Sequence, residues 1–280
     1  MSDDFPAGLT FVEDDGVAPD TFNVLLFGPP KSGKSTAAAT APGPILYLNA
    51  EGKGALGYAR KVALERGNRI HEVALPNGKN GNSALAVMRA TVEHLRSGNE
   101  PVVQSVVVDT IGKVREALAN ELVVPGSKNS IQQWGKVADL VADFVRTLRD
   151  LPVNVVFLAH TDQVDDAEAG RTVRPLIGGK ATEIVPGEVD VVAFTGAVAV
   201  EGEPVRYVGQ LVDGKGRTGL GDRSGVLAAG GPVRDLDLSL WLADYRAGLT
   251  PDDLPFDAVE PQTLDEAIAV GDVPELDEVA

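Results

Sequence analysis

The chain has 280 residues, no cysteine and a formal net charge of −16. The lack of cysteine excludes a disulfide scaffold, a thiolate metal site and thiol catalysis. No apolar run approaches the roughly 20 residues of a membrane-spanning helix, and the first residues are acidic where a secretory signal would be basic. We therefore expect a soluble, cytoplasmic protein with no membrane partner.

The negative charge lies at the two ends of the chain. Residues 1–20 carry six acidic residues and residues 250–280 carry ten, and neither segment contains lysine or arginine. Between them, residues 21–249 are neutral, so a local basic groove is compatible with the total charge. Both ends have the composition of segments that bury too little apolar surface to order themselves. We expect an acidic mobile segment at 1–20, one domain at 21–249 and an acidic mobile tail at 250–280.

Apolar runs alternate with segments of helical periodicity along the neutral part of the chain. We expect strands at 23–27, 45–49, 70–75, 102–108 and 153–159, and helices at 34–40, 55–66, 83–96 and 131–151. Continuous apolar strands separated by helices predict an α/β fold, with a mostly parallel central sheet covered by helices on both faces. Two later runs, 189–199 and 205–212, predict antiparallel strands at one edge.

Residues 28–36 follow the first strand and begin a helix. Gly28-Pro29-Pro30-Lys31-Ser32-Gly33-Lys34-Ser35 has the pattern G-x-x-x-x-G-K-[ST] of a P-loop. Its glycines let backbone N–H groups face phosphates, and the helix start adds a positive end. We expect ATP or a similar nucleotide on this segment, with Lys34 at the phosphates and the Ser35 hydroxyl on Mg²⁺. The binding residues are then Gly28, Pro29, Pro30, Lys31, Ser32, Gly33, Lys34, Ser35 and Thr36.

Two carboxylates end neighbouring strands. Asp109 follows the apolar run 105–108 in the manner of a Walker B strand, which predicts that it shares Mg²⁺ with Ser35. No glutamate follows Asp109, whereas Glu51 ends the strand at 45–49, so Glu51 is the candidate base for the attacking water. The structural alternatives are that Asp109 caps a loop and Glu51 caps a helix.

These segments resemble the core of RecA-type recombinases. The resemblance rests on the P-loop, on Asn49-Ala50-Glu51 and on Val108-Asp109-Thr110. In that family the glutamate at the position of Glu51 activates water. A further strand ends in a polar residue that senses the γ-phosphate, and His160 takes that position here, where RecA itself has glutamine.

A closer resemblance is to phage-type RecA-like ATPases that include single-strand annealing proteins of the Sak group. It spans about residues 21–225 and rests on the order of several short motifs: Gln133-Trp134-Gly135, His160, Gly179-Lys180, Pro186-Gly187 and Lys215-Gly216-Arg217-Thr218-Gly219. It implies a bacterial or phage-infected cell and a homo-oligomer, ring or filament. In such assemblies Lys215 and Arg217 would reach the γ-phosphate of the neighbouring subunit. A residue in this role is called an arginine finger, and Arg223 is an alternative candidate for it. The structural alternative is that these residues belong to a basic loop that is exposed to solvent and has no such role.

Residues 161–188 are too long for a simple connection and are rich in glycine and charge, which predicts a functional loop. The resemblance implies that single-stranded DNA is held there, by Arg171, Arg174 and Lys180. The acidic residues of the segment oppose this interpretation, and it has no aromatic residue on which a base could stack.

The sequence therefore favours a Mg²⁺-dependent ATPase that acts on single-stranded DNA in recombination or annealing. Its expected partners are copies of itself, DNA and a single-strand-binding or replication protein. The alternative is a nucleotide-gated loader or protein-binding module without DNA-stimulated turnover. A small-molecule kinase is disfavoured because the chain lacks an arginine-rich cluster for a lid over the phosphates.

Overall fold

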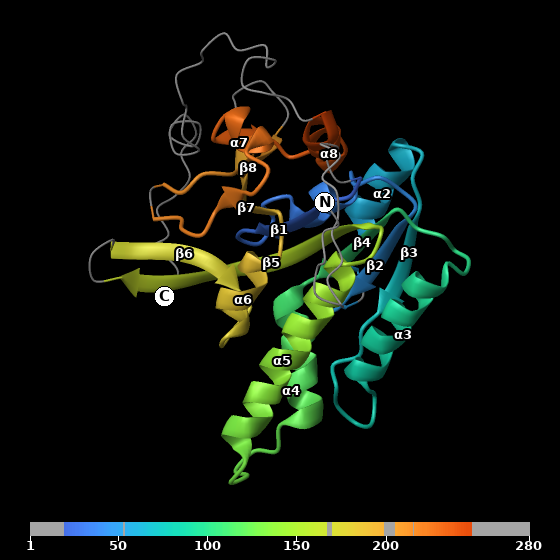
Figure 1. Cartoon of the computed structure of the whole chain (residues 1–280), viewed down its shortest axis with the longest axis vertical. Helices are drawn as coiled ribbons and strands as arrows, with labels where there is room; N and C mark the ends of the chain where they lie inside the picture. Colours follow the sequence, from blue (N-terminus) through green and yellow to red (C-terminus); the bar gives the residue numbers. More distant parts are fainter. Residues whose placement is uncertain (1–19, 53, 167–169, 199–204, 215, 248–280) are drawn as a thin grey trace, which may run out of the picture.

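The computed structural model describes residues 20–247 except for residues 53, 167–169, 199–204 and 215 (Figure 1). The predictions for the two acidic ends thus lie outside the described residues, save Asp20. No helix within the described part of the chain is long and apolar enough to cross a membrane.

The centre of the molecule is a mostly parallel sheet, as the sequence predicts. Its strands follow the order β10-β8-β7-β1-β5-β4-β2-β3, and β6 and β9 pair with β5 and β7. The strands from β7 to β3 in this order are parallel, whereas β8 adds to β7 in the antiparallel direction. Their bounds are β1 Asn23–Phe27, β2 Ile45–Asn49, β3 Ile70–Ala74, β4 Ser105–Asp109, β5 Asn154–Asp166, β6 Gly170–Leu176, β7 Val191–Val198, β8 Arg206–Gln210, β9 Gly221–Asp222 and β10 Val233–Asp235.

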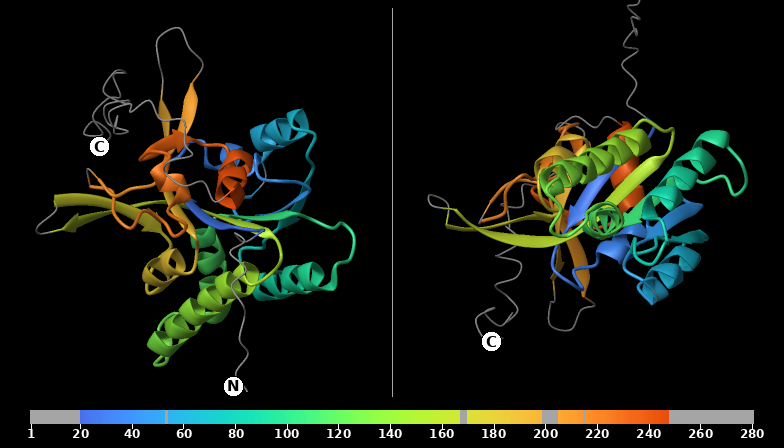
Figure 2. Two further views of the ribbon diagram at one scale, coloured as in Figure 1. Left: turned by 45° about the horizontal axis from the view of Figure 1, so that its top comes forward. Right: turned by 90° about the horizontal axis from the view of Figure 1, so that it is seen from below.

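Helices cover both faces of the sheet (Figure 2). One face packs against α3, α4, α5 and α6, and the other against α1, α2, α7 and α8. Alternate residues of a strand enter the two cores: Leu25 and Phe27 pack on the first, Val24 and Leu26 on the second. The helices are α1 Lys34–Ala38, α2 Gly57–Glu65, α3 Ala84–Ser97, α4 Ile111–Leu122, α5 Ser130–Arg149, α6 Ala181–Gly187, α7 Val226–Ala229 and α8 Leu238–Ala247.

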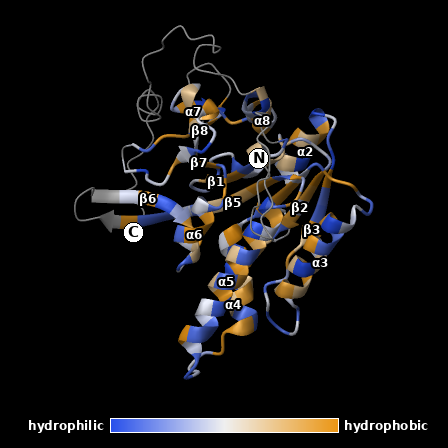
Figure 3. Ribbon diagram, in the orientation of Figure 1, coloured by the Kyte–Doolittle hydropathy of each residue, from blue (hydrophilic) through white to orange (hydrophobic). Residues whose placement is uncertain are grey.

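Burial on both faces explains why the central strands are apolar without alternation. Figure 3 shows this pattern, with hydrophobic residues along the strands and polar residues on the outer sides of the helices.

The predicted loop at 161–188 is wrong in form. β5 continues to Asp166 and pairs with β6 as an antiparallel hairpin that projects from the domain, and α6 follows (Figure 1). Polar residues outnumber apolar ones after His160 because the outer half of β5 leaves the covered part of the sheet.

The first and last described segments meet at the edge where the central strands begin. The Arg246 guanidinium donates a hydrogen bond from Nε to the carbonyl of Asp20, at 2.8 Å. Nearby, the rings of Phe22 and Tyr245 lie 5.9 Å apart. The carboxyl ends of the strands lie at the opposite edge, and the predicted site residues gather there.

Candidate functional site

The turn between β1 and α1 has the tight geometry that its two glycines allow. Gly33 has a φ of 87°, in the left-handed region that favours glycine. A Cβ atom on Gly33 would lie 2.4 Å from the ring of Tyr207, and one on Gly28 would lie 2.2 Å from Thr195 Oγ1. Neither position therefore admits a side chain, because β7 and β8 pack directly against the loop.

The side chain of Lys34 is folded into this loop. Its Nζ donates to the carbonyl oxygens of Gly28 and Pro29, at 2.8 and 2.7 Å. Burial lowers the pKa of Lys34 to about 8, and the negative charges of Asp109 and Glu51 partly oppose that shift. The ammonium is thus held at the loop by carbonyl groups that phosphate oxygens can replace.

Asp109 ends β4 beside the P-loop. Ser35 Oγ donates to Asp109 Oδ2 at 3.0 Å, and the buried Tyr47 hydroxyl donates to the same oxygen. Burial raises the pKa of Asp109, while these two hydrogen bonds oppose the rise. A serine hydroxyl and a carboxylate are ligands that Mg²⁺ prefers, so the residues present fit the predicted metal site. Tyr47 was not predicted, although its place in the apolar run 45–49 was the available signal.

Glu51 is positioned by a turn after β2. Asn49 Oδ1 accepts hydrogen bonds from the backbone N–H groups of Glu51 and Gly52, at 3.0 and 3.1 Å. The Glu51 carboxylate accepts a hydrogen bond from Thr110 Oγ1 at 2.7 Å and lies 3.3 Å from His160 Nε2. The sheet therefore brings together three side chains that follow β2, β4 and the inner part of β5.

Glu51 does not cap the helix that follows it. Helix α2 has Leu56 at its N-cap and α4 has Thr110, and neither helix has a side-chain capping hydrogen bond. The register explains the grouping instead, because Asn49 pairs with Asp109 and Asp109 pairs with Leu158.

Residues 21–220 match the AAA domain family. The chain belongs to this family. The match includes the P-loop, Glu51, Asp109 and His160, and it identifies a nucleotide-binding domain of the P-loop ATPase type. A comparison with curated proteins gives no match.

In this AAA domain, Thr195 is a contact of the P-loop that sequence reasoning missed. It is fully buried in the middle of β7, and its Oγ1 lies 2.6 Å from Ser32 Oγ. Thr195 Oγ1 also donates to the carbonyl of Phe27 at 3.3 Å. One hydroxyl thus links the P-loop to the end of β1, which fixes the loop against the sheet.

The predicted finger residues of the AAA domain lie apart from Glu51. Arg217 Nη1 donates to Gln210 Oε1 at 2.9 Å, and its guanidinium lies 4.6 Å from the ring centroid of Phe194. Arg223 Nη2 donates to the carbonyl of Gly187 at 2.8 Å. Lys215 lies outside the described residues. Both described arginines therefore contact their own subunit.

The predicted DNA contacts lie on the β5–β6 hairpin and at the start of α6. Arg174 forms an ion pair with Asp162 across the hairpin, at 3.1 Å, and Lys180 is exposed at the N-cap of α6. The Arg171 backbone pairs with Asp165, and its side chain lies outside the described residues. One acidic residue of this segment, Asp162, therefore pairs with one of the predicted DNA contacts, Arg174.

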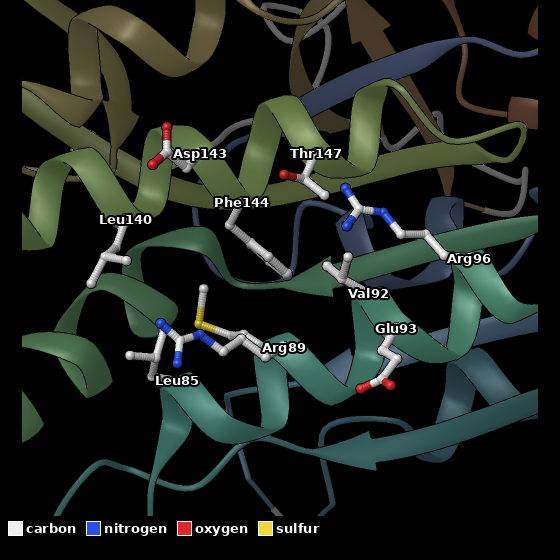
Figure 4. Close-up of a pocket in the computed structure, with 10 residues that line it drawn as sticks. Leu85, Arg89, Val92, Glu93, Arg96, Leu140, Asp143, Phe144 and Thr147 are labelled. Carbon is white, nitrogen blue, oxygen red and sulfur yellow. The ribbon is translucent and has the colours of Figure 1, made fainter.

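A cavity of about 470 Å³ lies between α3 and α5, away from these residues (Figure 4). Leu85, Val92 and Phe144 form its apolar wall, with Arg89 and Arg96 along the α3 side. It contains no P-loop residue, so its size does not make it the nucleotide site of the AAA domain.

Proposed function

We propose that this protein is a RecA-like ATPase that acts on single-stranded DNA in phage-type recombination or annealing, in a homo-oligomer whose subunits share ATP sites. The observation that carries the proposal is the position of Glu51. Its carboxylate is bonded by Thr110 and His160 at the edge of the sheet that also carries Lys34 and Asp109. A base at that place suits attack on the terminal phosphate of a nucleotide in the P-loop.

In the proposed reaction, the side chains of the P-loop, Asp109 and Glu51 have separate roles. Lys34 exchanges its bonds to the Gly28 and Pro29 carbonyls for bonds to phosphate oxygens. Ser35 and Asp109 would hold Mg²⁺, which neutralises phosphate charge when it is bound. Glu51 accepts a proton from water as the water oxygen bonds to the γ-phosphorus and the bond to the bridging oxygen breaks, giving ADP and phosphate.

His160 supports coupling between DNA and turnover. It follows the inner part of β5 and pairs in register with Leu176 of β6, so it belongs both to the hairpin and to the group around Glu51. A ligand that displaces the hairpin would therefore alter the hydrogen bond at Glu51.

The test is ATP turnover with and without single-stranded DNA, together with the mass of the assembly in the presence of ATP. Single-stranded DNA should raise turnover, Lys34→Ala should abolish it, and Glu51→Gln should lower it about 100-fold or more with nucleotide still bound. Glu65→Gln is the matched control, because Glu65 forms an exposed ion pair with Lys61 on α2. Turnover that no DNA changes would refute the DNA-stimulated reaction.

The second candidate is a nucleotide-gated loader or protein-binding module. The internal contacts of Arg174 and Arg217 favour it, since both cations already have partners in their own subunit. Removal of residues 250–280 separates the two candidates. It should tighten DNA binding if the acidic tail competes with DNA, and it should weaken binding of a protein partner if that partner reads the tail.

A further inference from the structure

A second cavity, of about 350 Å³, adjoins the group around Glu51. It lies between α4, α5 and the segment that follows β6. Thr110 and His160 line it on the side of Glu51, and its other lining residues include Arg115, Trp134, Leu176 and Gly178 together with the Lys113–Glu116 ion pair. The two groups that hold Glu51 therefore also face this cavity.

The outer part of the cavity combines an aromatic ring with a cation. Trp134 is 42% exposed, and the Arg115 guanidinium lies 4.8 Å from its ring centroid. Gly178 makes room for this pair, because a Cβ atom there would lie 2.8 Å from Arg115 Nη1. Leu176, on the same wall, is 44% exposed.

Arg115 lacks a carboxylate partner within the described part of the chain, and partial burial lowers its pKa. By contrast, the neighbouring Lys113 is paired with Glu116, at 2.7 Å. The Arg115 guanidinium is thus partly removed from water and has no carboxylate beside it among the described residues. A bound anion would compensate for this loss of hydration.

A single-stranded nucleotide matches both features of this wall. Bases stack on exposed aromatic rings and guanidinium planes, and cations beside them contact the phosphates. A carboxylate ligand would use the guanidinium alone, and an aliphatic side chain would use the ring alone.

We propose that this cavity holds one base of single-stranded DNA, stacked on the Trp134–Arg115 pair with its phosphate on Arg115. A base bound in the cavity would influence Glu51 through Thr110 and His160, because both residues line the cavity and form hydrogen bonds with the Glu51 carboxylate. The inference rests on the proposed function, and it supplies the aromatic residue that the segment 161–188 lacks. Trp134 comes from α5, far from that segment in the sequence.

Tryptophan fluorescence gives a direct test. The chain has two tryptophans, and Trp241 is 1% exposed, so a Trp241→Phe variant reports on Trp134 alone. A dye-labelled oligothymidylate is titrated into this variant, and dye anisotropy and tryptophan emission are read together. Emission should be quenched over the same concentrations at which anisotropy rises. If thermal unfolding shows that Trp241→Phe fails to fold, the wild-type chain is used, since the buried Trp241 adds a constant background.

Substitutions of Trp134 and Arg115 provide a second test. Trp134→Ala should weaken oligothymidylate binding roughly ten- to a hundred-fold, and Trp134→Phe should restore most of it. Arg115→Gln should reduce the dependence of log affinity on log salt by about 0.7. Both changes should bring the ratio of turnover with DNA to turnover without DNA toward one. Lys61→Gln on α2, across the sheet, removes one positive charge and should leave binding and this ratio unchanged.

These experiments distinguish failure of the base site from failure of the proposed function. If DNA raises anisotropy and turnover while Trp134 emission and the Trp134→Ala variant show no change, the cavity is not the base site and the proposed function stands. If DNA neither binds nor stimulates the wild-type chain, the proposed function fails and the base site fails with it. Loss of a protein partner alone in Trp134→Ala would also overturn the inference.

Discussion

Tyr47 and Ser35 donate to the same oxygen of Asp109, so the buried carboxylate depends on two hydroxyl groups. In Tyr47→Phe the ring keeps its packing and one donor is lost. We expect a loss of about 1–3 kcal/mol in the free energy of unfolding, because a buried acceptor is left underbonded. Urea denaturation without nucleotide measures it. Tyr58→Phe is the control, since Tyr58 is 60% exposed, and an equal loss in both variants would contradict the role assigned to Tyr47.

Lys34 predicts a pH dependence of nucleotide binding. Its pKa of about 8 lies below the ordinary value because of burial, so the ammonium form is complete below that pH and is lost above it. ATP binds the ammonium form, so affinity should fall as pH rises past about 8, by up to tenfold per pH unit. Calorimetry in buffers of different ionisation enthalpy should detect proton uptake on binding at about pH 9 and far less at about pH 6.5. Equal uptake at both pH values would contradict the assignment.

Among the elements, α3 depends on a cap at its first turn. Ser83 Oγ accepts a hydrogen bond from the N–H of Ala86 at 3.0 Å and donates to Glu121 of α4 at 2.6 Å. Ser83→Ala should lower the free energy of unfolding by about 1 kcal/mol, with nucleotide affinity unchanged. Ser97→Ala, at the other end of the helix, is the comparison and should cost less, because Ser97 contacts the exposed C-terminal turn. The measurement is chemical denaturation of both variants, and an equal cost would argue against the cap.

The central elements could be predicted from the sequence because the strands are apolar throughout and the helices bury one face at helical spacing. Strands β1, β2 and β5 begin within one residue of the predicted positions, and α3 and α5 differ by one or two residues at each end. Helix α4 was missed although Ile111, Val114 and Leu118 have helical spacing and are fully buried. The outer half of β5 was missed because hairpin pairing with β6, rather than burial, holds it in place.

Part of the site was predictable for a related reason. The P-loop and Glu51 lie just beyond the ends of apolar strands, and Asp109 is the last residue of one, and parallel strands bring such residues to one edge. Thr195 and the Trp134–Arg115 pair carry no local signal, because their contacts depend on how β7 and α5 pack against the rest of the chain. Pairing partners of this kind follow from tertiary structure alone.

For the whole molecule, a shared ATP site predicts complementation between two inactive variants. Lys34→Ala should remove the nucleotide site of its own subunit. If Arg217 acts on the γ-phosphate of a neighbouring subunit, as proposed, Arg217→Ala should lower turnover up to about 1,000-fold. A mixed assembly contains sites with an intact P-loop from one subunit and an intact Arg217 from the other. Turnover of the mixture should exceed the sum of the two variants measured separately.

The control replaces Arg217→Ala with Arg223→Ala in the same mixture. If Arg223 is the finger, recovery is seen in that mixture instead. If neither mixture exceeds the sum of its parts, each subunit works alone, and the contacts of Arg217 with Gln210 and Phe194 are structural.

The hydrogen bond between Arg246 and Asp20 also fixes how the domain is attached to the rest of its chain. The polypeptide enters and leaves at almost the same point, beside the starts of the strands. The first and last residues of the described domain are therefore held together, and the domain has one attachment region instead of two. Lys34, Glu51 and Asp109 lie at the opposite edge of the sheet, so this attachment region leaves that edge uncovered.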